Sequence, residues 1–403
     1  MKVRTRDFIY TTDDLFFAST NYIHPEDRFI SFLRYIPDEN GDREKNGKKY
    51  SKVTSEEAYN YLKKNHPEYL YFCDVSQVEM MGVPLKKVKE IIKPEERLNE
   101  IRIQEMKTPS NNPIIEKLLK VADFFHYIAK IDYKDLGISG SILPNLEQSG
   151  VSDIDFVVYG LKNHRKAMKT FEKYKDKELE IKLSDDKIND YTLRVFDENK
   201  DNELKKLKKI TLNSIKDDYW EKIYNKRMKD SSLSKKEFCW YENRKNNRGV
   251  IERTLFDILA TRDWDEIKGN WGDTRYESVG IAKIEATIEN ALSSFDNPAT
   301  YKIKDLNVLE FIDKDIKFTG ENIDFIGKID EIVSFTHTYA GQAIEGEKII
   351  AKGKVEKVLK KISKKTVNKK EKKEEESYRI VVGTTRESID EFIKLKNIPL
   401  NEN

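Results

Sequence analysis

The chain has 403 residues, which is enough for two or three domains. Charged residues make up 36% of it and hydrophobic residues 38%, and 74 basic against 72 acidic side chains leave a net charge of only +2. This balance argues against a general nucleic-acid coat or a membrane-surface protein, because both need one sign of charge in excess.

Cys73 and Cys239 are the only thiols, and they lie far apart in the chain. This excludes a disulfide framework and a thiolate-rich metal site. The sequence has no apolar run of the roughly 18 residues that span a bilayer, and its start lacks the continuous apolar core of a signal peptide. We therefore expect a cytoplasmic protein without a membrane span.

The first segment, residues 1–100, predicts an N-terminal α+β domain. Residues 14–35 are rich in aromatic and branched apolar side chains, which favours strands. Thr54 and Glu57 have the spacing of a capping box, so we expect a helix to begin there. No motif in this segment indicates a chemical activity.

A charged, apolar-poor stretch near residue 100 marks the boundary of a central domain, expected over residues 101–295. Residues 113–128 predict an amphipathic helix because their apolar side chains recur every 3.6 residues, and residues 278–292 predict another for the same reason. Strands are predicted at residues 136–139, 154–158 and 249–261.

Residues 296–403 predict a C-terminal β-rich domain, a small sheet or barrel, because short β-type runs alternate there with glycines. Within it, residues 359–376 consist mainly of Lys and Glu. They form either a solvated hairpin extension or a loop without regular structure. The fold class expected for the whole chain is α+β with several domains.

Asp153 and Asp155 flank Ile154 at the start of the most apolar strand of the central domain. Because side chains alternate along a strand, both acids project from one face, about 6–7 Å apart along the backbone. Two ionised carboxylates so close repel each other, and a divalent cation removes that penalty. Ligands that are all oxygens favour Mg²⁺ or Mn²⁺ over zinc.

Gly140 and Ser141 end one predicted strand just before the chain turns towards these acids. A glycine lets the backbone approach a ligand closely, and exposed N–H groups with a hydroxyl can hold phosphate oxygens. Phosphate beside paired carboxylates is a place where a metal ion can bridge protein and nucleotide.

The motif in residues 136–160 has a hydrophobic strand ending in Gly140-Ser141, an eleven-residue spacer, and Asp153-Ile154-Asp155-Phe156 preceded by Ser152. It resembles the DNA polymerase beta superfamily of nucleotidyltransferases. More widely, the chain is similar to an archaeal group of that superfamily in which this core lies between two further segments. The stretches that carry the wider similarity are residues 32–37, 152–160, 247–251, 336–342 and 378–384.

The resemblance implies a central nucleotidyltransferase fold, a mixed β-sheet with helices on one side. It also implies a reaction, in which an acceptor hydroxyl attacks the α-phosphate of a nucleoside triphosphate and pyrophosphate leaves. Two Mg²⁺ or Mn²⁺ ions would stabilise the attacking and leaving oxygens.

In this family Asp153 and Asp155 would bind the metals together with a third carboxylate on a neighbouring strand. Asp257 is the expected third acid, because bulky apolar residues flank it on a predicted strand, and it would help to deprotonate the attacking hydroxyl. An edge-strand acid facing water is the other explanation of Asp257. Asp263 and Asp265 compete with it for the role.

A triphosphate also needs positive side chains around it. Lys245 and Arg248 precede the strand of Asp257 and are the expected partners, and Arg165 on the helix after the acids is a further candidate. The resemblance adds three residues to the nucleotide site, namely Gly140, Ser141 and Ser152.

The leading functional hypothesis is metal-dependent nucleotidyl transfer to an unknown hydroxyl on RNA, a protein or a small molecule. The C-terminal β domain would then bind the acceptor, since small barrels often bind nucleic acid. The alternative is a non-catalytic nucleic-acid-binding or scaffold protein that retains the fold without turnover. The large flanking segments leave this alternative open.

Overall fold

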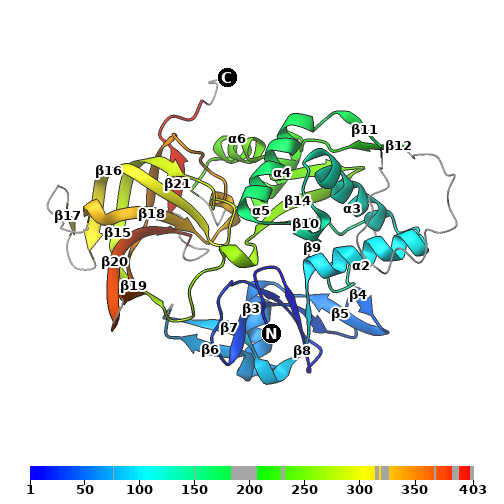
Figure 1. The fold of residues 1–403 in the computed structure, drawn as a ribbon, viewed down its shortest axis with the longest axis horizontal. Helices are drawn as coiled ribbons and strands as arrows, with labels where there is room; N and C mark the ends of the chain where they lie inside the picture. Colours follow the sequence, from blue (N-terminus) through cyan, green and yellow to red (C-terminus); the bar gives the residue numbers. More distant parts are fainter. Residues whose placement is uncertain are drawn as a thin grey trace.

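The computed structural model has three β-sheet units that follow one another along the chain (Figure 1). Each unit has a hydrophobic core of its own, and a smaller cluster of buried side chains lies between the first two units. The structure describes residues 1–75, 77–148, 150–182, 207–227, 232–313, 317–318, 326–366, 369–383 and 390–399.

The N-terminal unit is an eight-stranded sheet with one long helix, α1 (Ser55–Asn65). The predicted capping box is confirmed: Thr54 accepts a hydrogen bond from the Glu57 backbone, and the Glu57 side chain accepts one from the Thr54 backbone. The strands are β1 (Phe8–Thr11), β2 (Phe16–Ser19), β3 (Arg28–Pro37), β4 (Arg43–Lys45), β5 (Lys48–Lys52), β6 (Leu70–Cys73), β7 (Val78–Pro84) and β8 (Val88–Ile92).

The charged stretch near residue 100 is a helix, α2 (Pro94–Lys107), rather than an irregular linker. Leu98 and Ile101 are buried in the core of the central unit, and α2 packs against β9 (Leu136–Ile138). Few residues of α2 are buried, and they lie about one turn apart on one side of the helix. The sequence therefore has a low apolar content although one side of the helix is packed.

The central sheet is mixed and has the order β13-β14-β10-β9. β10 (Ile154–Tyr159) runs parallel to β14 (Thr254–Thr261), while β9 and β13 (Arg248–Ile251) run antiparallel to their neighbours. Side chains of α3 (Pro113–Asp123) and α4 (Leu161–Tyr174) share a core with the apolar face of β10. The unit also contains β11 (Glu178–Lys182), β12 (Leu207–Thr211), α5 (Asp217–Arg227) and α6 (Lys235–Lys245).

The C-terminal unit is a sheet of seven strands, and five of them close into a barrel, since the first of the five pairs with both the second and the fourth. Residues 278–292 were predicted as a helix, and that prediction was wrong, because they lie mostly in β15 (Thr274–Asn290). Small and branched residues are buried at every second position of β15, as in a strand. The same residues also fit a helical spacing of 3.6, which led to the wrong prediction. The other strands are β16 (Ala299–Asp313), β17 (Lys317–Phe318), β18 (Ile329–Ser334), β19 (Lys348–Thr366), β20 (Lys369–Val382) and β21 (Phe392–Leu395).

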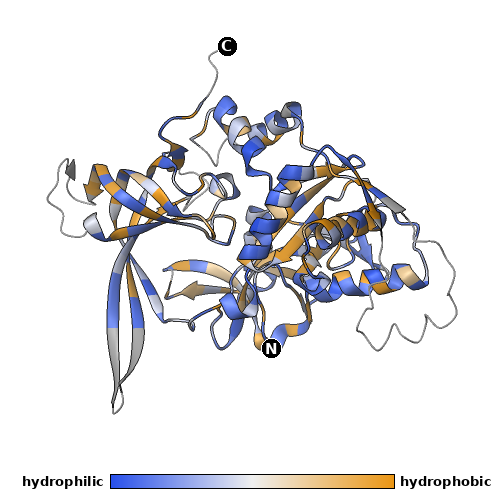
Figure 2. Cartoon of the chain, turned by 45° about the horizontal axis from the view of Figure 1, so that its top comes forward, coloured by the Kyte–Doolittle hydropathy of each residue, from blue (hydrophilic) through white to orange (hydrophobic). Residues whose placement is uncertain are grey.

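The Lys/Glu-rich residues 359–376 form the hairpin extension rather than a loop. β19 and β20 stay paired from Leu359 opposite Glu376 to Thr366 opposite Lys369, and the hairpin projects from the barrel (Figure 2). Residues 367–368 and Thr384 lie outside the described part of the chain.

Contacts from helix α6 and from the loop between β15 and β16 join the barrel to the rest of the molecule. Helix α6 buries Phe238 and Tyr241 in the barrel core. The loop from β15 to β16 carries Asp296, which accepts hydrogen bonds from Tyr22 of the N-terminal unit and Arg262 of the central unit. None of the described helices is long and apolar enough to cross a membrane.

Gly249 offers a test of the packing that positions β13. A Cβ added there would lie 2.6 Å from ring atoms of both Phe171 and Phe256, so the sheet cannot hold even a methyl group without moving. We expect Gly249→Ala to cost about 1–3 kcal/mol by overpacking and to lower the thermal midpoint measured by circular dichroism. Gly327→Ala, where no atom lies within 4 Å, is the control and leaves the midpoint unchanged. Equal midpoints in both variants would contradict the packing described for β13.

Candidate active site

A row of functional groups crosses the central sheet on one face. Asp155 of β10 is the register partner of Asp257 on β14, and Asp257 is in turn the partner of Arg248 on β13. Residues paired in register point to the same side of a sheet. On the other side of Asp155, the Ser139 backbone N–H donates to the Asp155 carbonyl oxygen at 2.9 Å. The acids therefore lie side by side at the centre of the row.

The opposite face of β10 explains why these acids point where they do. Ile154, Phe156 and Val158 are buried in the core with α3 and α4, so alternation places Asp155 on the face away from both helices. Asp153, two residues before Asp155, is close enough to raise the pKa of Asp155. The structure thus brings together the three aspartates expected from the sequence.

Asp257 is not an edge-strand acid, because β14 lies between β13 and β10. Nε and Nη2 of Arg248 donate to the two carboxylate oxygens of Asp257, the second at 3.0 Å. Burial works against the charge of Arg248, but Asp257 outweighs it and raises the arginine pKa. Arg248 therefore holds and neutralises Asp257 and leaves Asp155 without such a partner.

Gly140 lies directly against Asp155. A Cβ at this position would overlap the Asp155 carboxylate, and the backbone φ of Gly140 is +64°, in the left-handed region. Both facts require glycine. The glycine-serine turn is therefore fitted to the acid.

Hydroxyl groups tie the two ends of the spacer loop together. The Ser141 hydroxyl donates to Ser152 Oγ at 3.1 Å, and the Gln148 backbone N–H donates to the same oxygen at 2.9 Å. Ser152 is next to Asp153 in the chain, so this contact holds the turn beside the acids. That gives the spacing between the two motifs a structural reason.

The pKa of Asp155 is raised to about 6. Burial is the largest cause, followed by the nearby charge of Asp257, while Arg6 and Arg34 act in the opposite direction. Asp155 is therefore a carboxyl group whose negative charge is only partly compensated in the absence of a bound cation.

Basic residues that the sequence analysis missed come from the N-terminal sheet. Arg34 on β3 and Lys52 on β5 lie within electrostatic reach of Asp155, and Lys52 also feels Asp153. Burial and the neighbouring Arg34 lower the pKa of Lys52, while the two acids raise it. We call Arg34 and Lys52 the basic wall, because these two side chains of the N-terminal sheet interact electrostatically with the acids.

Packing holds this wall in place. Tyr35 and Tyr50 of the N-terminal sheet share a buried cluster with Leu143 and Leu146, which belong to the loop between Ser141 and Ser152. Arg43 also donates to the Leu146 carbonyl oxygen. The loop of the glycine-serine motif is therefore packed between the two units.

A β-bulge explains the direction of Arg34. Phe16 of β2 pairs with Tyr35, but the next residue, Phe17, pairs with Leu33, so Arg34 is the extra residue. A bulge interrupts the alternation of side chains and can re-aim one of them. The bulge is visible only once β2 and β3 are paired in the structure, so the sequence did not reveal the role of Arg34. Residues 32–37 had entered the sequence analysis only through the wider resemblance.

Two expected phosphate-binding residues lie elsewhere. Lys245 is buried and donates to Glu242 at 2.6 Å and to the Thr338 carbonyl at 2.8 Å, which fixes α6 to the barrel. Arg165 donates to Ser294 at 2.7 Å and to the Ala291 carbonyl. Both side chains serve the contact between units, and the structure does not bring them to the acids.

The two competing acids follow β14. Asp263 caps the short helix Trp264–Glu266 and pairs with Arg4 at 3.4 Å. Asp265 is exposed in the same helix. Neither belongs to the row formed by Asp155 and Asp257.

Comparison with known proteins identifies one relative over the full length. The chain is 40% identical to the uncharacterized protein MJ1086 of Methanocaldococcus jannaschii, over 98% of this chain and 100% of the relative. The chain belongs to the family of MJ1086. No protein-family model and no solved structure matches the chain. Membership of this archaeal family therefore assigns no activity, and the site has to be interpreted from its geometry.

A second acidic cluster, Asp13, His66 and Glu68, is the one group among the described residues whose ligand atoms all lie within 4.8 Å of one another. Lys87 Nζ lies 2.9 Å from Asp13 and 3.2 Å from Glu68, so an ammonium group already balances this cluster. By the same measure, the ligand atoms of the three aspartates are spaced more widely.

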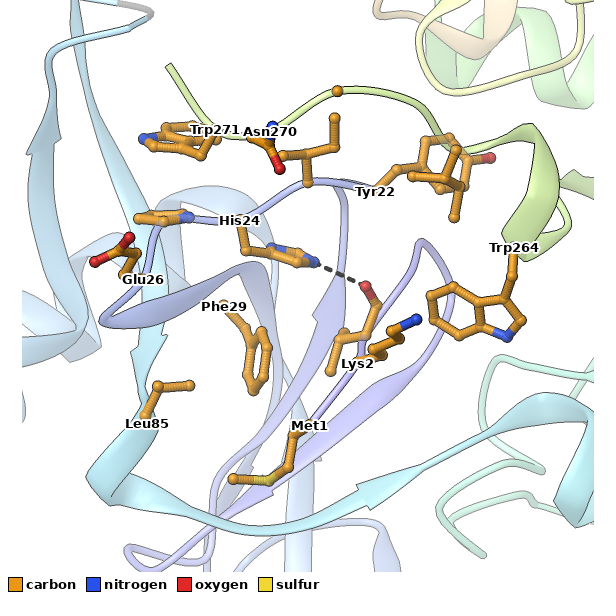
Figure 3. Close-up of a pocket in the computed structure, with 15 residues that line it drawn as sticks. Met1, Lys2, Tyr22, His24, Glu26, Phe29, Leu85, Trp264, Asn270 and Trp271 are labelled. Atoms are coloured by element: carbon orange, nitrogen blue, oxygen red, sulfur yellow. Dashed lines mark hydrogen bonds between the residues drawn. The ribbon is translucent and has the colours of Figure 1, made fainter. Parts of the chain in front are cut away.

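A cavity of about 490 Å³ lies between the start of the chain and residues 264–271 (Figure 3). Aromatic side chains such as Trp264 and Trp271 line it together with His24. His24 Nδ1 accepts from the Ile30 N–H, and its Nε2 lies 3.1 Å from the Val3 carbonyl, so both ring nitrogens are engaged. This cavity begins beyond the end of β14, away from the aspartates.

The raised pKa of Asp155 predicts a pH-dependent stability. Below about pH 4 the carboxyl is neutral in both states. Between about pH 4 and pH 6 the unfolded chain loses the proton first, so the folded state loses stability as the pH rises. Without divalent cations, we expect Asp155→Asn to gain about 2–3 kcal/mol at pH 7.5, or roughly 4–8 °C in the thermal midpoint, and little at pH 4.

Scanning fluorimetry in EDTA at the two pH values measures this difference. Asp265→Asn, which removes an exposed acid, is the matched control and shifts the midpoint equally at both. A gain of the same size at pH 4 and pH 7.5 for Asp155→Asn would show that the carboxyl is not destabilised by its neighbours.

Proposed function

We propose that the chain transfers a nucleoside monophosphate from a nucleoside triphosphate to an acceptor hydroxyl. The acceptor oxygen forms a bond to the α-phosphorus, the bond to the β-phosphate bridging oxygen breaks, and pyrophosphate leaves. The single observation that carries the proposal is the pairing of Asp155 with Asp257 on adjacent parallel strands, with Gly140 pressed against Asp155. The class of acceptor is not part of this proposal.

The residues fit a divalent cation by the chemistry of their donors. Asp153, Asp155 and Asp257 offer only carboxylate oxygens, which Mg²⁺ and Mn²⁺ prefer. Burial, followed by the charges of Asp257 and Asp153, raises the pKa of Asp155, and a bound cation offsets such uncompensated negative charge. One or two such ions, when bound, would supply charge that stabilises the attacking and leaving oxygens.

The chain's own residues supply the other functions. Arg34 and Lys52 face the acids from the N-terminal sheet, and within the described part of the chain neither side chain is hydrogen bonded or paired with an acid. They are therefore placed to bind the triphosphate oxygens, in the role first expected of Lys245. Backbone N–H groups of a glycine-serine turn such as Gly140-Ser141 are of the kind that binds phosphate oxygens, and this turn lies directly beside Asp155.

Arg248 controls what Asp257 can do. Both carboxylate oxygens of Asp257 accept hydrogen bonds from Arg248, so this ion pair competes with an acceptor hydroxyl for the carboxylate without excluding it. A triphosphate would be the natural new partner for Arg248, because guanidinium groups bind phosphate oxygens in the same forked manner. Binding of the nucleotide would thus free the base.

Two observations favour the alternative of a binding protein without turnover. The Arg248 pair and the wide spacing of the aspartates are compatible with a fold that has lost its metal site. Calorimetry separates the two functions. Nucleotide binding that strengthens with Mn²⁺ supports the enzyme, and nucleotide binding indifferent to Mn²⁺ supports the alternative.

Turnover gives the direct test of the proposed site. The full chain, incubated with each of the four nucleoside triphosphates, Mg²⁺ or Mn²⁺ and a mixture of acceptors, should release pyrophosphate. Asp153→Asn should lower the rate at least about 100-fold, because the charge of a ligand is lost where the transition state needs it most. Asp265→Asn is the control and keeps the rate of the wild type. Pyrophosphate release that survives Asp153→Asn would place the chemistry elsewhere.

The basic wall makes a separate prediction. Replacing a guanidinium that binds phosphate removes a charge-assisted hydrogen bond, so Arg34→Gln should raise KM for the triphosphate about 10- to 100-fold with a smaller change in kcat. Arg28→Gln is the matched control on the same strand, because Arg28 pairs with Asp27 and lies over the Tyr71 ring. Equal kinetics in the two variants would exclude Arg34 from the triphosphate site.

A further inference from the structure

The pairing order of the C-terminal barrel defines its topology. Going round the barrel, the strands follow the order β15, β16, β18, β20 and β19, and β19 pairs again with β15. All neighbours are antiparallel except β18 and β20, which run parallel. This is the strand order of the OB-fold, a small barrel that binds oligonucleotides across its second and third strands and the loops beside them.

The loop between the fourth and fifth strands is the unusual part of this barrel. β19 pairs with β15 only as far as Lys360, and beyond that point β19 and β20 continue as a two-stranded ribbon. We call residues 357–366 and 369–376 the basic ribbon. At about 3.3 Å per residue, residues 361–366 extend the ribbon roughly 20 Å beyond its last pairing with β15. An isolated two-stranded ribbon is only marginally stable in water, so such a projection favours a role in contacting a partner.

The basic ribbon has a larger net positive charge than the whole chain. It contains nine lysines and four glutamates, an excess of five positive charges, while the whole chain has a net charge of +2. The rest of the molecule is therefore net negative. Backbone register places Lys365 opposite Lys370. Outside the basic ribbon the chain has 65 basic and 68 acidic side chains, so its net positive charge comes from this projection.

The second and third strands of the barrel carry suitable groups as well. Lys304 and Asn307 are exposed on β16. Phe335, which is 54% exposed, directly follows β18. Exposed aromatic rings beside lysines are what single-stranded nucleic acid uses for stacking and phosphate contacts.

We propose that the C-terminal barrel binds single-stranded nucleic acid, with the basic ribbon holding the phosphate backbone and the outer face of β16 and β18 receiving the bases. Identifying this strand as the acceptor of the nucleotidyl group rests on the proposed function, whereas the binding itself does not. The loop from β15 to β16 lies at one end of the face and is bonded to both other units through Asp296, so a strand that crosses the face approaches the catalytic unit.

Fluorescence anisotropy with a labelled 20-nucleotide oligouridine tests the binding. The full chain carrying Asp153→Asn is used in EDTA without nucleotide, so that neither turnover nor metal contributes. In the ribbon variant four lysines become glutamine, and we expect at least a 10-fold loss of affinity at about 100 mM salt. The slope of log K against log[salt] should fall by about 3, because each lost phosphate contact on a single strand removes about 0.7. The ribbon variant changes Lys360, Lys361, Lys364 and Lys365.

A matched control changes four lysines of the N-terminal unit and should keep the affinity within about twofold. Circular dichroism melting confirms that each variant is folded. The control changes Lys63, Lys64, Lys86 and Lys89 to glutamine.

Three results would overturn the proposal: no binding of the oligouridine, equal losses in ribbon and control variants, or tighter binding of a duplex of the same length or of phosphatidylserine vesicles. Pyrophosphate release is measured separately on the chain with Asp153 intact. Binding without release would contradict the proposed function alone, and release without binding would contradict the inference about the barrel alone.

Discussion

The arrangement of this molecule depends on one electrostatic constraint, the repulsion between carboxylates placed side by side on adjacent strands. Asp155 and Asp257 face each other in register, and Asp153 adds a third negative charge. The fold compensates this cost from both sides. Arg248 pairs with Asp257 within the sheet, and the N-terminal sheet contributes Arg34 from outside it. Asp155 keeps a raised pKa, so a cation bound beside it would stabilise its charged form.

This constraint also explains why the candidate site belongs to two units rather than one. The central sheet carries the acids and the glycine that fits against them, but the cations opposite Asp155 that lie off the sheet come from residues more than a hundred positions earlier in the chain. The packing of Tyr35 against Leu143 and Leu146 links the two. A change in that hydrophobic contact would alter the electrostatics of the acids although it touches no charge.

The sequence predicted the features that depend on neighbouring residues. It did not predict the features that depend on the pairing of strands far apart in the chain. The positions of Asp153 and Asp155 follow from strand alternation, and Asp257 stood out because apolar residues flank an acid. Arg34 could not be found, since its direction depends on a bulge against β2 and on the docking of β3 onto a distant loop. Lys245 was chosen for its nearness in sequence to Asp257, yet α6 turns its ammonium group towards the barrel. The strand β15 was taken for a helix because small and branched residues satisfied both periods.

Helix α6 connects the barrel to the strand that carries Arg248. Lys245, in its last turn, is bonded to the Thr338 carbonyl of the barrel, and three residues later Arg248 holds Asp257. Between them Asn246 caps the helix with a left-handed backbone, so little chain separates the two contacts. The position of the barrel relative to the central unit therefore fixes where β13 begins and how Arg248 reaches the acids. A partner that displaced the barrel would act on Asp257 through this short segment, without contact with the acids themselves.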